Sequence, residues 1–364
     1  MVMVNQGCSG RRLGLRPWQL MLLFAAILLL PDRVLALCSK PTLSGQLQTL
    51  TFEAIERHFR VAYPKDYAAN VNNPMVVVLH GWGGDENSFL SHEAFTQYAE
   101  KRGVVLVAPR GLGSGAPDHQ YNAWTFSGSA TGVTSVGAPI CEVDSTPDYR
   151  YPSCKMSGTA QTICAWTHCQ STFPSDTAFL LALIKHLEAK LCIDPDRVYL
   201  MGGSNGGNLI WDVARLPPLA DKLAAMASLI GLPHESYGQF PELKRLPPAL
   251  LVTGLRDDTD PPGPWDSLSA TTTSNGGDRY FYESASATIR NWSKASGCAV
   301  GTKARRVPAP QPFDCRVYCQ DEMAEVPALD CRLDMAHEYQ LDTTWPLTLD
   351  FLLSNRRLSG SRLD

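Results

Sequence analysis

Gly202-Gly203-Ser204-Asn205-Gly206 is the stretch that decides the fold, because it lies where a predicted strand passes into a predicted helix. Residues 197–201 before it are apolar and partly β-branched, which predicts a short buried strand. Residues 208–214 after it have the apolar spacing of a helix. A G-x-S-x-G motif in this setting predicts a nucleophile elbow, a sharp turn that holds its serine in a strained backbone conformation. Ser204 is therefore the candidate nucleophile.

The candidate base follows from order along the chain. In proteins with this elbow the nucleophile comes first, then the acid, then the histidine. Two of the eight histidines follow Ser204, namely His234 and His337. His234 precedes the strand that could carry an acid, so the order selects His337 as the base.

The candidate acid should follow a strand that lies between the serine and the histidine. Residues 248–253 predict such a strand, and Asp257, Asp258 and Asp260 come just after it. We expect Asp257 to be the acid, with Asp258 second and Asp260 third, because aspartates beside proline commonly only solvate a turn. A carboxylate at this position holds the imidazole in the useful tautomer and stabilises the imidazolium.

A glycine-rich turn after an early strand predicts donors for an oxyanion. Residues 75–79 form an apolar run typical of a strand buried on both faces, and His80-Gly81-Trp82-Gly83-Gly84 follows it. The expected donors are the backbone N–H groups of Trp82 and of Asn205, the residue after the serine, with Gly83 as the alternative to Trp82. We expect His80 to be structural.

Several local motifs between His80 and His337 together match the sequence pattern of one protein family. They are His80-Gly81, Trp124, Asp176-Thr177-Ala178-Phe179, Asp196-Arg197-Val198-Tyr199, Gly203-Ser204-Asn205-Gly206-Gly207, Trp292, Gly297-Cys298 and His337. Together they resemble the secreted esterase family of feruloyl esterases, acetylxylan esterases and polyhydroxybutyrate depolymerases, within the α/β-hydrolase superfamily. The chain departs from that pattern in having Thr253-Gly254 before the acid, Trp82 in the oxyanion turn and Glu338-Tyr339 after the histidine.

The resemblance implies a function. It implies a secreted serine carboxylic-ester hydrolase, or carboxylesterase, with a Ser204–Asp257–His337 triad. Its substrate would be an ester of plant cell-wall polysaccharide, of the feruloyl or acetylxylan type, cleaved through an acyl-enzyme. Neither a metal nor an organic cofactor is implied. A polyhydroxybutyrate-type polyester depolymerase is the first alternative, and a non-catalytic hydrolase-fold binding protein is the second. The natural ester and the oligomeric state stay open.

The first 36 residues predict an export signal. Three arginines precede the apolar run 20–30, and Val34-Leu35-Ala36 is a small-residue cleavage site. Eleven apolar residues are too few to span a bilayer, so we expect no membrane association after cleavage; an uncleaved anchor is the alternative. Residues 1–36 carry four Arg and one Asp, so their removal changes the net charge from −4 to −7. An acidic chain without Lys/Arg blocks argues against nucleic acid as a partner.

The cysteines predict a covalent framework. Ten remain after cleavage, and an even count in a secreted chain indicates disulfides. The candidates are Cys38, Cys141, Cys154, Cys164, Cys169, Cys192, Cys298, Cys315, Cys319 and Cys331. A bridge within the last four would brace the loop that carries His337. No C-x-x-C pair occurs, so zinc-site spacing is missing. The sequon at Asn291 predicts a glycoprotein if the host is eukaryotic.

Alternation of strands and helices predicts one α/β-hydrolase domain over residues 37–357, with a mostly parallel sheet flanked by helices and a polar tail at 358–364. The expected elements are a hairpin at 47–63, a βαβ unit with strands at 75–79 and 104–108 around a helix near 86–101, helices at 176–191, 283–296 and 344–354, and a strand at 223–229.

Residues 110–172 interrupt this alternation. They are rich in Gly, Ser, Thr and Pro and hold four of the cysteines. Long loops in compact domains are usually functional or disordered, and cystines resist disorder. We therefore expect a disulfide-stapled lid or rim over the serine. The candidates for an aromatic wall around an acyl group are Trp124, Phe126, Tyr149, Tyr151 and Trp166.

Overall fold

The computed structural model describes residues 44–67, 71–113, 121–143, 151–169, 175–274, 279–320 and 327–357. All of them belong to one compact unit, Cys38–Asp364. The expected leader (1–36), Cys38, Tyr149 and the expected tail (358–364) lie outside the described residues. Within the ranges just given, no helix is long and apolar enough to cross a membrane.

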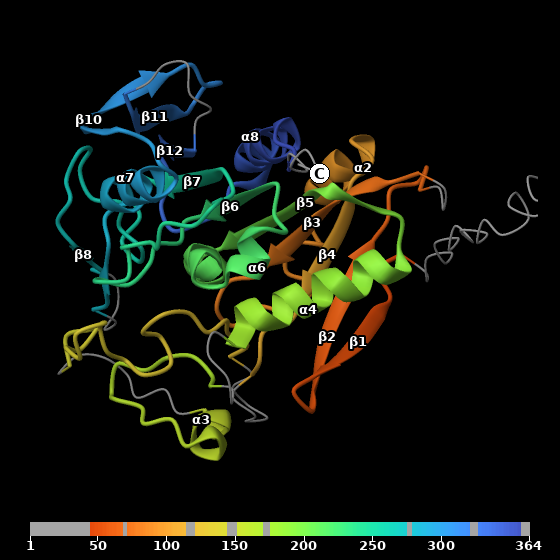
Figure 1. The fold of residues 1–364 in the computed structure, drawn as a ribbon, viewed down its shortest axis with the longest axis horizontal. Coiled ribbons are helices and arrows are strands. Elements are labelled where there is room, and N and C mark those ends of the chain that lie inside the picture. The colour runs from red at the N-terminus through yellow and green to blue at the C-terminus, as the bar shows by residue number, and fades with distance from the viewer. Residues whose placement is uncertain are drawn as a thin grey trace, which may run out of the picture. The chain divides into compact units, whose positions relative to one another are not determined.

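A ten-stranded sheet organises this unit (Figure 1). Its strand order is β1-β2-β4-β3-β5-β6-β7-β12-β11-β10. The bounds are β1 (Leu47–Phe52), β2 (Ile55–Ala62), β3 (Asn73–Leu79), β4 (Val105–Pro109), β5 (Ile193–Gly203), β6 (Ala225–Leu229), β7 (Ala249–Gly254), β10 (Val300–Val307), β11 (Asp314–Cys319) and β12 (Ala328–Leu333). The strands from β4 to β12 in this order are parallel, and antiparallel pairs extend both edges. The expected α/β class with a mostly parallel sheet is confirmed.

Helices cover both faces of the sheet. Side chains of α2 (Glu93–Lys101) and α8 (Leu341–Ser354) belong to the core on one face. The core on the other face contains side chains of α4 (Ser175–Lys190), α5 (Asn205–Ile210), the 3₁₀ helix η1 (Trp211–Arg215), α6 (Pro217–Ala220) and α7 (Ala285–Ala295). Figure 1 shows α2 and α8 side by side, with α4 across the sheet from them. Two short elements complete the description, α3 (Pro152–Ser157) and the hairpin β8 (Thr271–Thr272) with β9 (Phe281–Tyr282).

Strand β3 shows why both faces need cover. Met75, Val77 and Leu79 lie in the core beneath α4, while Val76 and Val78 lie in the core beneath α2 and α8. Successive side chains of a strand point to opposite faces, so a strand covered on both sides must be apolar throughout. All five side chains are at most 1% exposed.

One helix is shorter than the sequence predicts. Residues 86–92, expected to begin the helix that ends near 101, form turns, and α2 begins only at Glu93. The Asp85 carboxylate accepts a hydrogen bond from the Asn87 N–H (2.8 Å), and the Ser88 hydroxyl accepts one from the Asp85 N–H (2.9 Å). Such local side-chain bonds compete with helical ones and favour a turn.

The sheet edge made by β12, β11 and β10 was not predicted. β12 contains Asp330 and Arg332, which interrupt the apolar pattern of a buried strand. Their ion pair (2.7 Å) neutralises both charges inside the protein, and the Arg332 guanidinium also lies 3.7 Å from the centre of the Trp265 ring. A sequence pattern cannot show that two charges in one strand are buried together.

Four disulfides join described cysteines. Cys141–Cys164 and Cys154–Cys169 both close loops within residues 110–172, so the expected stapling of this insertion is confirmed. Cys298–Cys319 and Cys315–Cys331 tie β11 to its surroundings, and the second of these holds β12, the strand that leads to His337. Cys192 is disulfide-bonded as well.

Asn291, the expected glycosylation site, lies within α7. Its side-chain amide donates a hydrogen bond to the Gly238 carbonyl oxygen (3.0 Å). The acceptor nitrogen for a glycan is thus in contact with the protein, and glycosylation stays a prediction.

Candidate active site

Ser204 occupies a strained turn between β5 and α5. Its φ is 50° and its ψ is −120°, a region that side-chain-bearing residues rarely adopt and that costs of order 1–3 kcal/mol. The chain is packed so tightly here that a Cβ on Gly202 would collide with the Gly206 carbonyl, and a Cβ on Gly206 with the Leu79 carbonyl. The Ser204 N–H donates to the Leu229 carbonyl (2.8 Å). The turn has the geometry that the G-x-S-x-G motif predicts.

The three residues selected from the sequence form one hydrogen-bonded chain. Oγ of Ser204 lies 2.9 Å from Nε2 of His337. Nδ1 of His337 lies 2.9 and 3.0 Å from the two carboxylate oxygens of Asp257. With its proton on Nδ1, the imidazole donates to the carboxylate and offers the Nε2 lone pair to the hydroxyl, as a general base must. The structure brings the three side chains together, and their catalytic roles stay a prediction.

Strand pairing explains why Asp257 and His337 meet. β12 lies parallel to β7, with Leu333 opposite Gly254, so the carboxyl ends of the two strands are neighbours. The Leu255 N–H donates to the Leu333 carbonyl (2.9 Å) and keeps the two following loops together. Asp257 comes from the loop after β7, and His337 from the loop after β12. β12, the strand that the sequence did not predict, therefore positions His337, the histidine that it did predict.

The loop after β7 separates its three aspartates. Asp257 is buried, and its Oδ1 accepts hydrogen bonds from the Thr259 N–H (3.0 Å) and the Asp260 N–H (2.8 Å). Asp258 is exposed. Asp260 is buried but contacts Asn208 rather than the histidine (2.9 Å). The geometry agrees with Asp257 as first choice.

The candidate base and a neighbouring aspartate have shifted pKa values. Burial opposes protonation of His337, but its hydrogen bond to Asp257 and the charges of Asp260, Asp257 and Asp258 outweigh burial and raise the pKa of His337. Burial raises the pKa of Asp260 to about 7, with the nearby His337 opposing the rise and Asp257 adding to it. Asp260 therefore changes charge near neutral pH.

The two expected oxyanion donors, Trp82 and Asn205, line the same cavity as Ser204. Asn205 opens α5, so its N–H has no acceptor one turn earlier. Its side chain binds the Trp124 backbone twice, at 2.7 and 2.9 Å, and so fixes the residue. The Gly83 N–H, the alternative donor, already donates to the Asn122 carbonyl (2.9 Å), which leaves Trp82 as the preferred partner of Asn205. The donor roles stay a prediction.

His80 has a structural position, as expected. Its Nδ1 bonds the Gly81 carbonyl (2.7 Å), and its Nε2 accepts a hydrogen bond from the Gly111 N–H (2.9 Å). Burial lowers the pKa of His80 to about 4, so the ring is neutral. The ring thereby joins the turn after β3 to the loop after β4.

A cavity of about 120 Å³ lies beside Ser204. Its walls combine four aromatic rings with hydroxyl, amide and carboxyl groups. The lining residues are Trp82, Trp166, Ser204, Asn205, Asn208, Thr259, Asp260, Thr273, Tyr280 and Tyr282. Pockets for drug-sized ligands measure roughly 300–1,000 Å³, so this one suits a small group.

Only part of the expected aromatic wall lies at the cavity. Trp166 of the insertion lines it. Trp124 and Phe126 are instead fully buried in the core beneath α4, and Tyr151 packs in a small separate cluster within the insertion. Their expected place in the wall is therefore wrong, because Trp124 and Phe126 pack in the core and Tyr151 packs in its own small cluster.

Sequence reasoning missed several lining residues. Tyr280 and Tyr282 come from the region of β9, and Asn208 from the second turn of the helix that begins after the elbow. Isolated tyrosines near a two-residue strand carry no sequence signal. Asn208 could have been suspected, because it lies four residues after Ser204 and so on the same helical face.

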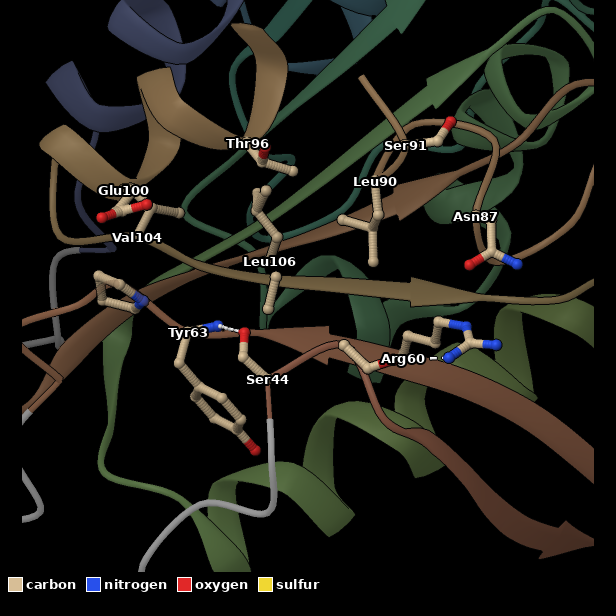
Figure 2. A pocket seen from close by; sticks show the side chains of 13 residues that line it. Ser44, Arg60, Tyr63, Asn87, Leu90, Ser91, Thr96, Glu100, Val104 and Leu106 are labelled. Carbon is tan, nitrogen blue, oxygen red and sulfur yellow. Dashed lines mark hydrogen bonds between the residues drawn. The ribbon is translucent and has the colours of Figure 1, made fainter. Parts of the chain in front are cut away.

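A larger cavity of about 370 Å³ lies elsewhere in the described unit (Figure 2). It is lined by residues of β2, β4 and α2, including Arg60, Leu106 and Glu100, and by Leu90 from the turns before α2. Arg60 donates to the Gly45 carbonyl (2.6 Å), and the Tyr63 N–H donates to the Ser44 hydroxyl (3.1 Å). None of the three triad candidates lines it, so size alone does not identify the site.

The described ranges contain no group of three His, Cys, Asp or Glu side chains placed to hold a metal ion.

Comparison with known proteins identifies the fold. No family model matches the chain. This chain is 27% identical over 209 residues to the putative esterase NocK of Nocardia uniformis subsp. tsuyamanensis. The match covers 57% of this chain and 46% of that protein. The chain thus spans about half the length of this curated relative.

Solved structures extend the comparison over most of the chain. The acetyl xylan esterase from Aspergillus awamori is similar with a TM-score of 0.53 and 13% identity, covering 85% of this chain and 99% of that one. A ferulic acid esterase has a TM-score of 0.44 and 12% identity, covering 84% of this chain and 96% of that one. The chain has the α/β-hydrolase fold.

Proposed function

We propose that this protein is a serine carboxylic-ester hydrolase that works through an acyl-enzyme. The observation that carries the proposal is the chain of contacts from Ser204 Oγ to His337 Nε2 (2.9 Å) and from His337 Nδ1 to Asp257 (2.9 Å), beside a cavity. The similarity to a putative esterase and to an acetyl xylan esterase supports the same type of reaction.

The proposed reaction has two displacements. His337 takes the proton of Ser204 as Oγ attacks the ester carbonyl, and Asp257 stabilises the imidazolium. The N–H groups of Trp82 and Asn205 hold the oxyanion, and each such donor contributes about 3 kcal/mol. The imidazolium then protonates the leaving alcohol. Water, deprotonated by the same imidazole, attacks the acyl-enzyme, and the acid and free Ser204 are released.

The cavity favours a short acyl group. About 120 Å³ holds about four water molecules, since a water occupies about 30 Å³ of liquid. An acetyl group fits this space whole, whereas a feruloyl group, with its substituted ring and its propenoyl chain, would extend out of the open side of the pocket. Of the substrate types expected from the sequence, acetylated polysaccharide therefore has more support than the feruloyl type. Secretion would agree with the disulfides, because disulfides persist in oxidising compartments.

The test compares four substrates. The wild type and Ser204→Ala are assayed on p-nitrophenyl acetate, acetylated xylan, methyl ferulate and polyhydroxybutyrate. We expect turnover of the two acetyl substrates by the wild type and none by the variant. Preference for methyl ferulate would overturn the acyl-size argument, and preference for the polyester would favour the depolymerase. If the wild type turns over none of the four substrates and is not labelled by a fluorophosphonate, the non-catalytic binding protein is the remaining hypothesis.

A further inference from the structure

The cavity beside Ser204 contains a carboxyl group that the proposed triad does not use. Asp260 is 2% exposed and lines the cavity together with Ser204. Its Oδ2 accepts a hydrogen bond from the Asn208 amide (2.9 Å), and Tyr282 is hydrogen-bonded to it as well. A carboxylate has about four acceptor positions, so these two bonds leave room for a ligand.

Asp260 differs from the other buried carboxylates in the described part of the chain. Each of the others has a cationic or imidazole partner within ion-pair distance: Glu86 with Arg110, Asp176 with Arg57, Asp194 with Arg197, Asp212 with Arg215, Asp257 with His337 and Asp330 with Arg332. No ion pair among the described residues includes Asp260. Burying a carboxylate without a partner is costly, and burial raises the pKa of Asp260 to about 7.

The walls around this carboxyl are aromatic. Trp82, Trp166, Tyr280 and Tyr282 line the same cavity. The face of an aromatic ring attracts cations, and the attraction is stronger where the contact is desolvated. A carboxylate among aromatic rings is the combination that binds an ammonium group. A ligand with a neutral hydroxyl in place of the ammonium group would need only an uncharged acceptor. Thr259, Thr273 and Asn208 already provide such groups in this cavity, so a hydroxyl would not require the buried carboxyl of Asp260.

We propose that the cavity is a pocket for a short aminoacyl group, whose protonated amine binds Asp260 while its carbonyl carbon lies at Ser204 Oγ. This inference rests on the proposed ester hydrolysis and names its substrate class. A 3-aminopropanoyl group has the size of the cavity, which holds about four water-sized groups. An acetyl group fits the same pocket but has no cationic end for Asp260, so acetyl esters would be cleaved without the contact.

Three isosteric p-nitrophenyl esters test the pocket. Butyryl, 3-hydroxypropanoyl and 3-aminopropanoyl groups have equal numbers of heavy atoms and end in a methyl, a hydroxyl and an ammonium group. For the wild type at pH 7.5 we expect kcat/KM on the amino ester to exceed that on butyrate by about ten-fold or more, because a charged hydrogen bond contributes about 1.5–3 kcal/mol. In Asp260→Asn this ratio should fall close to one. Asp258→Asn, which neutralises an exposed carboxylate of the same loop, should keep the wild-type ratio.

Two kinetic outcomes contradict the proposal. Butyrate turned over as well as the amino ester by the wild type would overturn it. A preference for the hydroxy ester over the amino ester would assign Asp260 to neutral donors instead and would also overturn it.

A binding measurement separates this inference from the proposed function. Ser204→Ala protein is titrated calorimetrically with propylammonium chloride and with 1-propanol. We expect saturable binding of propylammonium that weakens about ten-fold or more when Asp260→Asn is added. Equal binding to both proteins, or no binding, overturns the ammonium site whether or not any ester is cleaved. If the wild type cleaves no ester while the Ser204→Ala protein still binds propylammonium, only the proposed function is overturned.

Discussion

Two histidine–aspartate pairs in this molecule have almost the same contact distance and different surroundings. Nδ1 of His337 lies 2.9 Å from Asp257, and Nε2 of His168 lies 2.8 Å from Asp176. The His337 side chain is 21% exposed and its second nitrogen contacts Ser204, whereas both members of the other pair are 0% exposed. An imidazole–carboxylate contact is therefore not a catalytic signature by itself. A serine hydroxyl beside a cavity makes the difference.

The buried pair anchors the insertion to the sheet. Asp176, at the start of α4, also binds Arg57 of β2 (3.0 Å) and accepts a hydrogen bond from the Thr125 N–H (2.7 Å). Thr125 in turn donates through its hydroxyl to the His168 carbonyl. Burial opposes ionisation of Asp176, but His168 and Arg57 outweigh it and lower the pKa of this carboxyl to about 2. Asp176 therefore stays charged, and it holds two segments of the insertion in place.

The largest expected effect comes from removing the Ser204 hydroxyl, which contacts the His337–Asp257 pair and has no counterpart among the described residues at the His168–Asp176 pair. Ser204→Ala removes the nucleophile, and kcat should fall about 10⁶-fold, as in other enzymes of this type. The circular dichroism spectrum should stay that of the wild type, because the change removes one oxygen. Residual activity above about 1% of the wild type, in protein free of wild-type contamination, would show that Ser204 is not the nucleophile.

The next effect distinguishes Asp257 from Asp176, the carboxylates of the two histidine pairs. Asp257→Asn favours the wrong tautomer of His337, and kcat should fall about 10⁴-fold with the fold retained. A fall of less than ten-fold would mean that another group orients the imidazole. The matched variant is Asp176→Asn, which makes the same chemical change in the buried pair.

For Asp176→Asn we expect a loss of stability instead of a loss of chemistry. The change leaves the Arg57 guanidinium buried without its charged partner, which destabilises proteins by about 3–5 kcal/mol. Urea denaturation measures this loss, and kcat per folded molecule should stay within about three-fold of the wild type, an order-of-magnitude bound for a residue that does not touch the site. An unchanged urea midpoint would show that the pair is no anchor.

The smallest effect concerns pH. His337 must be neutral to act as a base, and its pKa is raised above the ordinary value of about 6.5. The kcat/KM profile should therefore rise with pH through a midpoint above about 6.5 and be lost below it. Asp260→Asn should lower the midpoint, since the charge of Asp260 helps to raise the pKa of His337. A midpoint that stays in place would show that the two groups are not coupled.

The sequence was informative where local chemistry and chain order act together. The glycines around Ser204, the strand before Asp257 and the late position of His337 were enough to select three side chains that lie in contact. The sequence could not show β12, because its two charges neutralise each other only in the folded protein. Apart from third place among the candidate acids, it gave Asp260 no role beyond solvating a turn, because the burial of this carboxyl beside the serine depends on Asn208 and Tyr282, which come from other elements.

Covalent labelling tests the central claim most directly. The protein is incubated with a fluorophosphonate, digested and analysed by peptide mass spectrometry, with His337→Ala as the comparison. The account predicts one phosphonylated residue, Ser204, in the wild type and far slower labelling in the variant. An unmodified Ser204 in folded protein, or a label on a different residue, would contradict the account.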